Sequence, residues 1–386
     1  MRVPIVYFYP GCRWEMPPGR HRLIMDAMAQ HHPVIFLESP QHSGRLLETK
    51  RPRIEKRHDN LTVIHNAFGF RYARLGKKLG RLSAALDARW MHRELRTLGV
   101  TDYVYWLSAN APNALWGMRT ERLVFDCIDP CFEPEGQEQF DRMEAEVVRQ
   151  AKVVFCTAEA LHEKLQRQHP HTYLVPNACA PEAYHPDATR PLSIPEPLKA
   201  RPRPVVGFMG TFDWRVDTAL LTEAAKRLPE YTFALLGRVN REQEGAVREL
   251  RGLPNVLMPG SVSEAEGFAY TAAFDVGLIP FLPGPINDAI NPVKMYMYLV
   301  AGKPVVSTWV RECVRHAPYV RAAENTEAFV GAIRQAVADN DAAAVTARIA
   351  FALQNTWDVR AREALKHLKA NGVLTEGLEP KRVEAV

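Results

Sequence analysis

The residues best suited to do chemistry gather in one stretch, residues 287–308, which reads NDAINPVKMYMYLVAGKPVVST. Asn291 and Pro292 are typical of a helix start, because asparagine can cap orphan amides and proline has the φ angle of a first helical turn. The apolar residues 295–300 predict a helix, and a buried strand follows it. Such a helix presents unpaired N–H groups and the positive end of its dipole, to which Lys294 adds a full charge. The stretch predicts an anion-binding site, and an ordinary helix–turn–strand unit is the alternative.

Two strand-end loops carry the glycines that a phosphate cradle requires. Residues 205–211, VVGFMGT, predict a strand that ends in a glycine loop, and a helix follows from about residue 218. Glycine allows backbone amides to approach an oxygen-rich group closely. The next predicted strand also ends in glycine and arginine, which indicates a second contact with a nucleotide. The residues that these loops offer to a diphosphate are Gly210, Thr211, Arg215, Gly237 and Arg238.

The segment PVKMYMYLVAGKPVVST, residues 292–308, resembles the donor-binding signature of bacterial GT-B glycosyltransferases in the family-4-like group, the glycosyl transferases group 1. The chain fits this group nearly end to end and is similar to its surface-polysaccharide and teichuronic-acid-type members. The resemblance implies that the Pro-x-Lys turn and the following helix hold a nucleotide sugar, with Lys294 in a catalytic role. The donor-binding residues in this stretch are then Asn287, Asp288, Asn291, Pro292, Val293, Lys294 and Met295.

Two positions depart from the pattern of that group. Met297 stands where the group has a glutamate that grips the nucleotide ribose, and Ala289 stands where an earlier glutamate is usual. Both acidic groups are therefore missing. Asn287, Asp288 or Glu264 could hold a sugar hydroxyl instead. The departure also supports an alternative, a non-catalytic glycosyltransferase-like subunit.

The resemblance implies an α/β fold of GT-B type, with two Rossmann-like domains that face a cleft and a C-terminal helix that crosses back to the first domain. Seven prolines between residues 181 and 204 predict a stiff, extended linker. The expected organisation is an acceptor domain over 1–180, the linker over 181–204, a donor domain over 205–352, the crossing helix over 353–375 and a tail over 376–386.

The first loop of the chain is expected to face the cleft, because ligands of open α/β sheets lie beyond the carboxyl ends of the strands. A predicted strand over residues 4–9 leads into this loop. Gly11, Trp14 and Arg20 are therefore candidate acceptor-side residues. A plain surface loop is the alternative interpretation.

Two aspartates follow a later predicted strand. Residues 123–130, LVFDCIDP, resemble a VYDCxDD element of relatives that build bacterial surface polysaccharides. Asp126 and Asp129 are candidate catalytic carboxylates, since a carboxylate at the rim of a cleft can orient an acceptor hydroxyl or take its proton. Helix capping is the alternative role for such aspartates.

A basic, half-apolar helix is predicted over residues 71–97, where leucines and aromatic residues recur at spacings of three and four. Lysines and arginines line a neighbouring stripe. Such a helix can lie on an anionic membrane surface, which suits a lipid-linked acceptor. A solvated face of a core helix is the alternative.

Composition agrees with two cored domains, because the chain has 386 residues and 47% apolar content. Residues 1–100 carry a net charge of +10 and the remainder −5, which indicates a negatively charged partner for the first domain. The six cysteines show no zinc-like pairing and indicate reduced thiols in a cytoplasmic protein. We expect no signal peptide and no membrane span.

The sequence contains no P-loop, zinc signature or nucleophile elbow. The motifs and the resemblance together favour an enzyme that moves a sugar from a nucleotide sugar to a saccharide or lipid-linked acceptor, with retention and without a metal or other cofactor. A nucleotide-sugar epimerase of similar fold is a further alternative. We expect no nucleic-acid partner and a cytoplasmic location, peripheral to the inner face of the membrane if the basic helix docks there.

Overall fold

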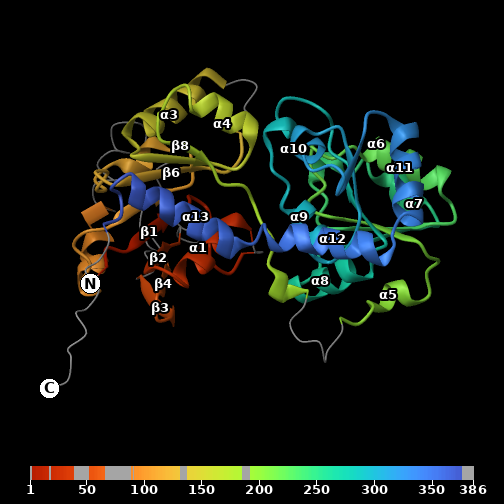
Figure 1. Ribbon diagram of the computed structural model, residues 1–386, viewed down its shortest axis with the longest axis horizontal. Helices are drawn as coiled ribbons and strands as arrows, with labels where there is room; N and C mark the ends of the chain where they lie inside the picture. Colours follow the sequence, from red (N-terminus) through yellow and green to blue (C-terminus); the bar gives the residue numbers. More distant parts are fainter. Residues whose placement is uncertain are drawn as a thin grey trace. The chain divides into compact units, whose positions relative to one another are not determined.

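The computed structural model describes residues 2–16, 19–38, 52–65, 88–89, 91–130, 137–184 and 192–375. The chain divides into two compact units (Figure 1). Unit 1 comprises Met1–Pro176 and Asp358–Val386, and unit 2 comprises Asn177–Trp357. Most of the predicted basic helix over residues 71–97 lies outside the described residues.

Unit 1 is built on an eight-stranded sheet in the order β3-β4-β2-β1-β5-β6-β7-β8. All neighbouring strands are parallel except β3, which pairs antiparallel with β4. The inner strands are buried and mostly apolar, as expected where helices cover both faces of a parallel sheet, although β4 and β6 also carry polar residues. The strands are β1 (Ile5–Phe8), β2 (Val34–Leu37), β3 (Arg53–His58), β4 (Leu61–His65), β5 (Val104–Leu107), β6 (Leu123–Cys127), β7 (Val153–Cys156) and β8 (Thr172–Leu174).

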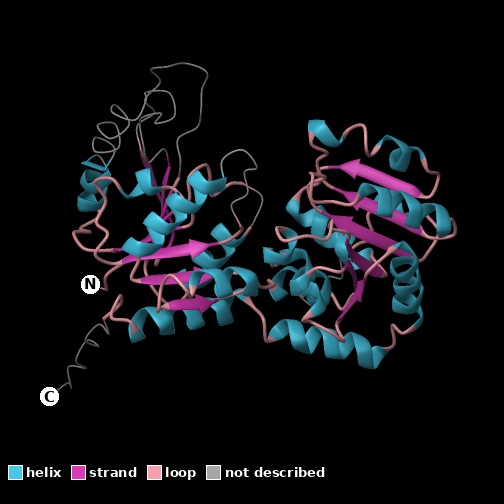
Figure 2. Cartoon of the chain, turned by 90° about the horizontal axis from the view of Figure 1, so that it is seen from above, coloured by secondary structure: helices cyan, strands magenta, loops and turns pink. Residues whose placement is uncertain are grey.

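Helices flank these strands (Figure 2). The last helix packs within unit 1, where Asp358 pairs with His31 at 2.5 Å and the ring of His367 stacks on Tyr173 at 3.8 Å between centroids. The helices of unit 1 are α1 (Arg20–Ala29), η2 (Pro112–Leu115), α3 (Gln137–Gln150), α4 (Glu159–Leu165) and, from Asp358 onward, α13 (Trp357–Ala370).

Unit 2 contains a six-stranded, fully parallel sheet in the order β11-β10-β9-β12-β13-β14. Two parallel, helix-covered sheets confirm the predicted α/β architecture with two Rossmann-like domains. The strands are β9 (Val205–Met209), β10 (Thr232–Leu236), β11 (Val256–Gly260), β12 (Val276–Ile279), β13 (Val305–Thr308) and β14 (Val320–Ala323).

The helices of unit 2 include short turns within the proline-rich segment that the sequence predicts as an extended linker. This segment belongs to unit 2 and contains η3 and α5, because proline is also favoured in the first turn of a helix. The helices are η3 (Pro181–Ala183), α5 (Glu196–Lys199), α6 (Thr218–Arg227), η4 (Arg241–Gln243), α7 (Arg248–Gly252), α8 (Glu264–Ala273), η5 (Asn287–Ala289), α9 (Val293–Val300), α10 (Arg311–Val314), α11 (Thr326–Ala338) and α12 (Ala342–Leu353).

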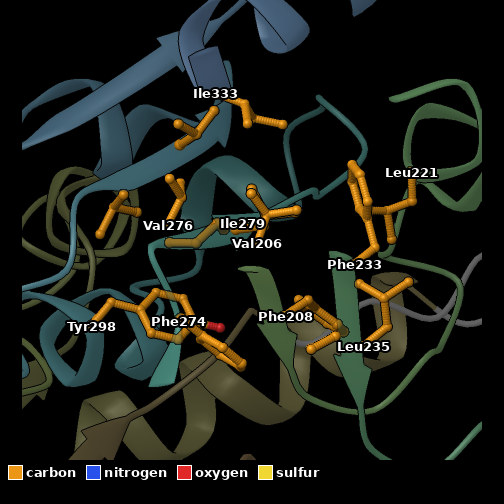
Figure 3. Close-up of a cluster of buried hydrophobic side chains, with 14 of the residues drawn as sticks. Val206, Phe208, Leu221, Phe233, Leu235, Phe274, Val276, Ile279, Tyr298 and Ile333 are labelled. Carbon is orange, nitrogen blue, oxygen red and sulfur yellow. The ribbon is translucent and has the colours of Figure 1, made fainter. Parts of the chain in front are cut away.

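The core of unit 2 fixes α9 against the sheet (Figure 3). Tyr298 of α9 is fully buried beside Phe274, and a Cβ on Gly277 of β12 would lie 2.3 Å from the Tyr298 ring. The Tyr298 hydroxyl also accepts a hydrogen bond of 3.0 Å from the backbone N–H of Met209, the last residue of β9. A buried side chain of this size contributes roughly 1.5–3 kcal/mol. The packing therefore sets the distance between α9 and the end of β9.

Candidate functional site

The helix α9 begins at Val293, two residues before the apolar run that predicted it. Its N-cap residue is Pro292, and no side chain caps the helix. The expectation that Asn291 caps the first turn is wrong. The Asn291 side chain instead accepts from the backbone N–H of Asn177 at 3.0 Å and donates to Glu312 at 2.8 Å. The Asn291 amide therefore bonds to residues distant in the chain, which the local sequence does not reveal.

Lys294 lies in the uncapped first turn of α9 and is half-buried. Its ammonium nitrogen lies 4.4 Å from the centroid of the Phe281 ring and 4.9 Å from that of Phe208. A Cβ placed on Gly210 would lie 3.1 Å from the same nitrogen. Glycine at position 210 therefore leaves the lysine room beside the backbone at the end of β9.

Burial first, and the positive charge of Arg215 second, lower the pKa of Lys294 from its ordinary value to about 7. The Asp213 carboxylate acts in the opposite direction. A partly desolvated cation at a helix N-terminus strengthens its attraction for an anion, because little water screens the charge. The first turn of α9 therefore favours an anionic ligand.

The glycine loops after β9 and β10 lie against each other. Gly237 has φ +131°, and a Cβ there would lie 1.9 Å from the carbonyl oxygen of Gly210. The Gly210 N–H donates to the carbonyl of Leu236 at 3.0 Å, and the Arg238 carbonyl accepts from Phe212 at 2.8 Å. The structure thus brings Gly210, Gly237 and Lys294 together at the carboxyl edge of the unit 2 sheet. Thr211, which is half-buried, and the exposed Arg238 are neighbours of these glycines in the chain.

Arg215 forms a close ion pair with Asp213, a residue that the sequence did not single out. Its Nη2 lies 2.5 Å and its Nε 3.0–3.1 Å from the carboxylate oxygens. Burial opposes ionisation of Asp213, but the hydrogen bonds from Arg215 and the charges of Arg215 and Lys294 outweigh it and lower its pKa. The pair fixes Arg215 on the loop that follows β9, which also contains Gly210. An aspartate followed two residues later by arginine was the sequence signal for this pair.

The loop between β12 and α9 is braced by its two polar residues. Asn287 is buried, and its Nδ2 donates to the carbonyl of Leu282 at 2.6 Å. Its Oδ1 is buried and has no hydrogen-bond partner among the described residues. Asp288 accepts from the backbone N–H of Arg311 at 3.0 Å, which secures the start of α10. Of the two, Asn287 retains an unused acceptor.

The remaining residues of the stretch belong to the hydrophobic interior. Met295 is fully buried in the core, Met297 packs against that core, and Ala289 is buried. Neither Ala289 nor Met297 brings a carboxylate to the site. Val293 is half-buried at the first position of α9.

In unit 1, Arg20 and Asp126 form a buried ion pair. The Arg20 Nη2 and Nε lie 2.9 and 3.1 Å from the two carboxylate oxygens, and Nη1 donates to the carbonyl of Pro176 at 3.2 Å. Both side chains are almost fully enclosed. Asp129, by contrast, is exposed in the loop after β6. The structure places Asp126 in the interior and Asp129 at the surface.

The first loop of unit 1 is held by Glu38, the residue directly after β2. Trp14 is buried with its ring centroid 5.2 Å from that of Phe36, and its backbone N–H donates to the Glu38 side chain at 2.7 Å. Gly11 is exposed, with φ +84°. Glu38 also pairs with His65 at 2.7 Å, where β2 and β4 end. No sequence motif marked this Glu38–His65 pair, because its members are far apart in the chain.

Among the described residues, no group of His, Cys, Asp and Glu is arranged to hold a metal ion. No helix in the described part of the chain is long and apolar enough to cross a bilayer. Residues 339–341 connect α11 to α12, and the Asp341 side chain caps α12. The cysteines that the structure describes are buried thiols.

Residues 203–339 match the protein family described as Glycosyl transferases group 1. The chain is 29% identical over 205 residues to TuaH of Bacillus subtilis, described as a teichuronic acid biosynthesis glycosyltransferase. This match covers 49% of the chain and 50% of TuaH, so the chain spans about half the length of that curated relative.

Solved structures resemble the chain over nearly its whole length. Sucrose-phosphate synthase from Thermosynechococcus elongatus has a TM-score of 0.69 at 15% identity and covers 96% of this chain and 99% of its own. Anabaena HepE, solved in complex with UDP, has a TM-score of 0.68 at 16% identity and covers 96% and 100%. The trehalose-6-phosphate synthase OtsA has a TM-score of 0.71 at 11% identity and covers 96% and 99%. At these identities the likeness shows the fold alone.

Proposed function

The chain has the GT-B fold and carries a glycosyl transferases group 1 domain over residues 203–339, and from this we propose that it is a glycosyltransferase. It moves a sugar from a nucleotide sugar to a saccharide or lipid-linked acceptor in bacterial glycan assembly. The description of TuaH supports the link to polysaccharide biosynthesis. The titles of two HepE structures, one with UDP and one with UDP and glucose, support a nucleotide-sugar donor.

The observation that carries the proposal is the position of Lys294. Its ammonium group lies in the uncapped first turn of α9 and beside Gly210 at the end of β9. When the bond between the anomeric carbon and the diphosphate oxygen breaks, the electron pair stays with the diphosphate. Lys294, the α9 dipole and the amides of the glycine loop are suited to stabilise that developing charge.

We propose transfer with retention of the anomeric configuration and without a metal. Retention rests on the resemblance to the family-4-like group, and metal independence on the positive charge that Lys294 and the α9 terminus supply to the diphosphate. Nuclear magnetic resonance of the newly formed glycosidic bond would test the first point. Turnover that survives chelation of divalent cations would test the second.

The acceptor role falls to the carboxyl edge of unit 1. Asp129 is exposed after β6, where an acceptor in solution can reach it, whereas the Asp126 carboxylate is buried against Arg20. We therefore assign Asp129 the acceptor contact and keep Asp126 as the partner that holds Arg20 in place. Replacing Asp129 by Asn should raise the KM for the acceptor and leave the KM for the donor unchanged.

A lipid-linked acceptor would bring the protein to a membrane. The basic residues between 71 and 97 support binding to anionic lipid. Binding to vesicles that contain anionic lipid, weakened by salt, is the expected result. Equal binding to neutral and anionic vesicles, or no binding, would rule out this surface and would favour a saccharide acceptor in solution.

The test of the proposed function is turnover of Lys294→Ala across a panel of nucleotide sugars. Loss of one group that stabilises the leaving diphosphate typically costs about 10²–10³-fold in kcat. Lys303→Ala is the matched control, because burial also lowers the pKa of Lys303, which follows α9 in the same unit. Its turnover should remain near that of the wild type.

The absence of carboxylates at Ala289 and Met297 supports a second candidate, a non-catalytic glycosyltransferase-like subunit. Binding of a nucleoside diphosphate without turnover of any nucleotide sugar would favour it. An epimerase of similar fold would instead convert a nucleotide sugar in the absence of acceptor. Turnover that requires an acceptor separates the transferase from both.

A further inference from the structure

Three buried polar side chains meet where α9 begins. Asn177, Asn291 and Glu312 are 4%, 2% and 1% exposed, and they come from the start of unit 2, the residue before Pro292 and helix α10. Burying so many polar atoms is costly unless each finds a partner. Their hydrogen bonds therefore determine the local backbone.

The amide of Asn291 is fixed at both ends. Its Oδ1 accepts from the backbone N–H of Asn177 at 3.0 Å, and its Nδ2 donates to Glu312 at 2.8 Å. In return, the Asn177 side chain donates to the backbone carbonyl of Asn291 at 2.6 Å. Each contact requires one end of the amide, so neither aspartate nor an apolar residue can replace it without loss.

We propose that Asn291 is a positioning residue for the diphosphate site. Together with Asn177 and Glu312, it fixes the first turn of α9 and so the place of Lys294, three residues farther along the chain. The inference rests on the proposed function, because the donor site that Asn291 would position is part of that proposal. Both ends of the Asn291 amide have partners, whereas Asn177 Oδ1 is buried without one among the described residues. Buried hydrogen bonds of this kind favour one geometry.

The rest of α9 is held by a different contact. The Tyr298 hydroxyl, in the last turn of the helix, accepts from the backbone N–H of Met209, and the Asn291 network contacts the start of the helix. Disturbing that network should therefore loosen the N-terminus of α9 while the body of the helix stays packed. Hydrogen exchange can detect this difference without any ligand.

The test exchanges donor and acceptor in the hydrogen bond between Asn291 and Glu312. Asn291→Asp keeps the acceptor for Asn177 but places a carboxylate against Glu312, which repels it. Glu312→Gln alone retains an acceptor for Asn291 and should bind donor as the wild type does. The double variant restores a donor–acceptor pair with the opposite direction, so it should recover what Asn291→Asp loses.

Two readouts are compared in the full chain: amide exchange over residues 293–300, and calorimetric binding of UDP and of inorganic pyrophosphate, a base-free probe. We expect Asn291→Asp to speed exchange in the first turn and to weaken binding at least tenfold. The double variant should return both to within threefold of the wild type. Asn177→Ala, which removes the reciprocal contact, should also weaken binding and replaces Asn291→Asp if that variant does not fold.

Asn255→Ala is the matched control. Asn255 lies directly before β11, and its side-chain amide donates to the backbone carbonyls of Ala225, Leu228 and Tyr231 at 2.9–3.1 Å. The control should lower thermal stability but leave binding unchanged. Unchanged exchange and binding in Asn291→Asp, or an equal loss of affinity in Asn255→Ala, would overturn the inference. If the wild type binds neither probe, the proposed function is contradicted. The exchange measurement would still show whether the Asn291 network holds the first turn of α9.

Discussion

Lys294 combines a low pKa with a position suited to anions. Burial and Arg215 lower its pKa to about 7, while two aromatic rings face its ammonium group. Near neutral pH, both the protonated and the neutral form of Lys294 are therefore populated. An anion that binds beside it favours the protonated state, because opposite charges attract most strongly where water is excluded.

This predicts that nucleoside diphosphate affinity falls as the pH rises above about 7. Between that pKa and the ordinary lysine value near 10.5, binding must take up a proton, so affinity falls by up to about tenfold per pH unit. Lys294→Arg, which stays charged, should remove this dependence. Calorimetry between pH 7 and 9 in buffers of different ionisation enthalpy checks it. Equal slopes for the two proteins would contradict the assignment.

The buried Arg20–Asp126 pair predicts that Asp126 contributes to the stability of the protein, whereas the exposed Asp129 does not. Asp126→Asn leaves the Arg20 charge buried without its partner and should lower the free energy of unfolding by about 3–5 kcal/mol. Asp129→Asn, at an exposed position, should change it by less than about 0.5 kcal/mol. Urea denaturation measures both. Similar losses for the two variants would mean that the buried pair is not what holds this part of unit 1.

At the scale of elements, the glycine loops after β9 and β10 are matched to each other. Gly237 approaches the Gly210 carbonyl too closely for any side chain, so the two loops form one surface. The alternation of strands and glycine loops was readable from the sequence, and helix α6 begins at Thr218 as predicted. The contact between the loops was not readable, because it joins segments 27 residues apart.

Gly237→Ala should therefore abolish nucleotide binding. The added Cβ would lie 1.9 Å from the Gly210 carbonyl oxygen, so the loop must move, and the φ of +131° adds strain of about 1–3 kcal/mol. Gly260→Ala is the control, since Gly260 has φ +82° and an added Cβ there would meet no atom within 4 Å. It should lose stability through strain yet keep affinity. Equal affinities for the two variants would show that the loop contact is irrelevant to binding.

The start of α9 shows where local rules fail. An apolar helix followed by a buried strand was predictable from residues 287–308, but the structure makes Pro292 the N-cap residue in place of the expected Asn291. The use of Asn291 was not predictable, because Asn177 and Glu312 lie 114 and 21 residues away. Local capping preference was overridden by buried tertiary partners.

At the scale of the whole molecule, the parallel sheets and helices of both units followed from the sequence pattern and the resemblance. The placement of Trp14, Arg20 and Asp126 in the interior of unit 1 did not. Arg20 and Asp126 are separated by 106 residues, and their pairing depends on how β6 and α1 meet. Sequence patterns identify the elements, whereas pairing across the sheet decides which polar residues are enclosed.

Donor binding is predicted to involve unit 2. The residues that gather around Lys294 lie in the loops after β9 and β10 and at the start of α9. Hydrogen exchange with and without UDP should show protection over residues 210–215, 237–239 and 291–295. Protection confined to unit 1 would contradict the placement of the donor site.

The central claim is that Lys294 and its surroundings bind a nucleoside diphosphate without a metal. The most direct measurement is calorimetric titration of the wild type, Lys294→Ala and Lys303→Ala with UDP, GDP, ADP, CMP and dTDP, with and without magnesium. We expect the wild type and Lys303→Ala to bind one diphosphate with an affinity that magnesium does not change, and we expect Lys294→Ala to lose this binding. Unchanged affinity in Lys294→Ala, or binding that requires magnesium, would contradict the central claim.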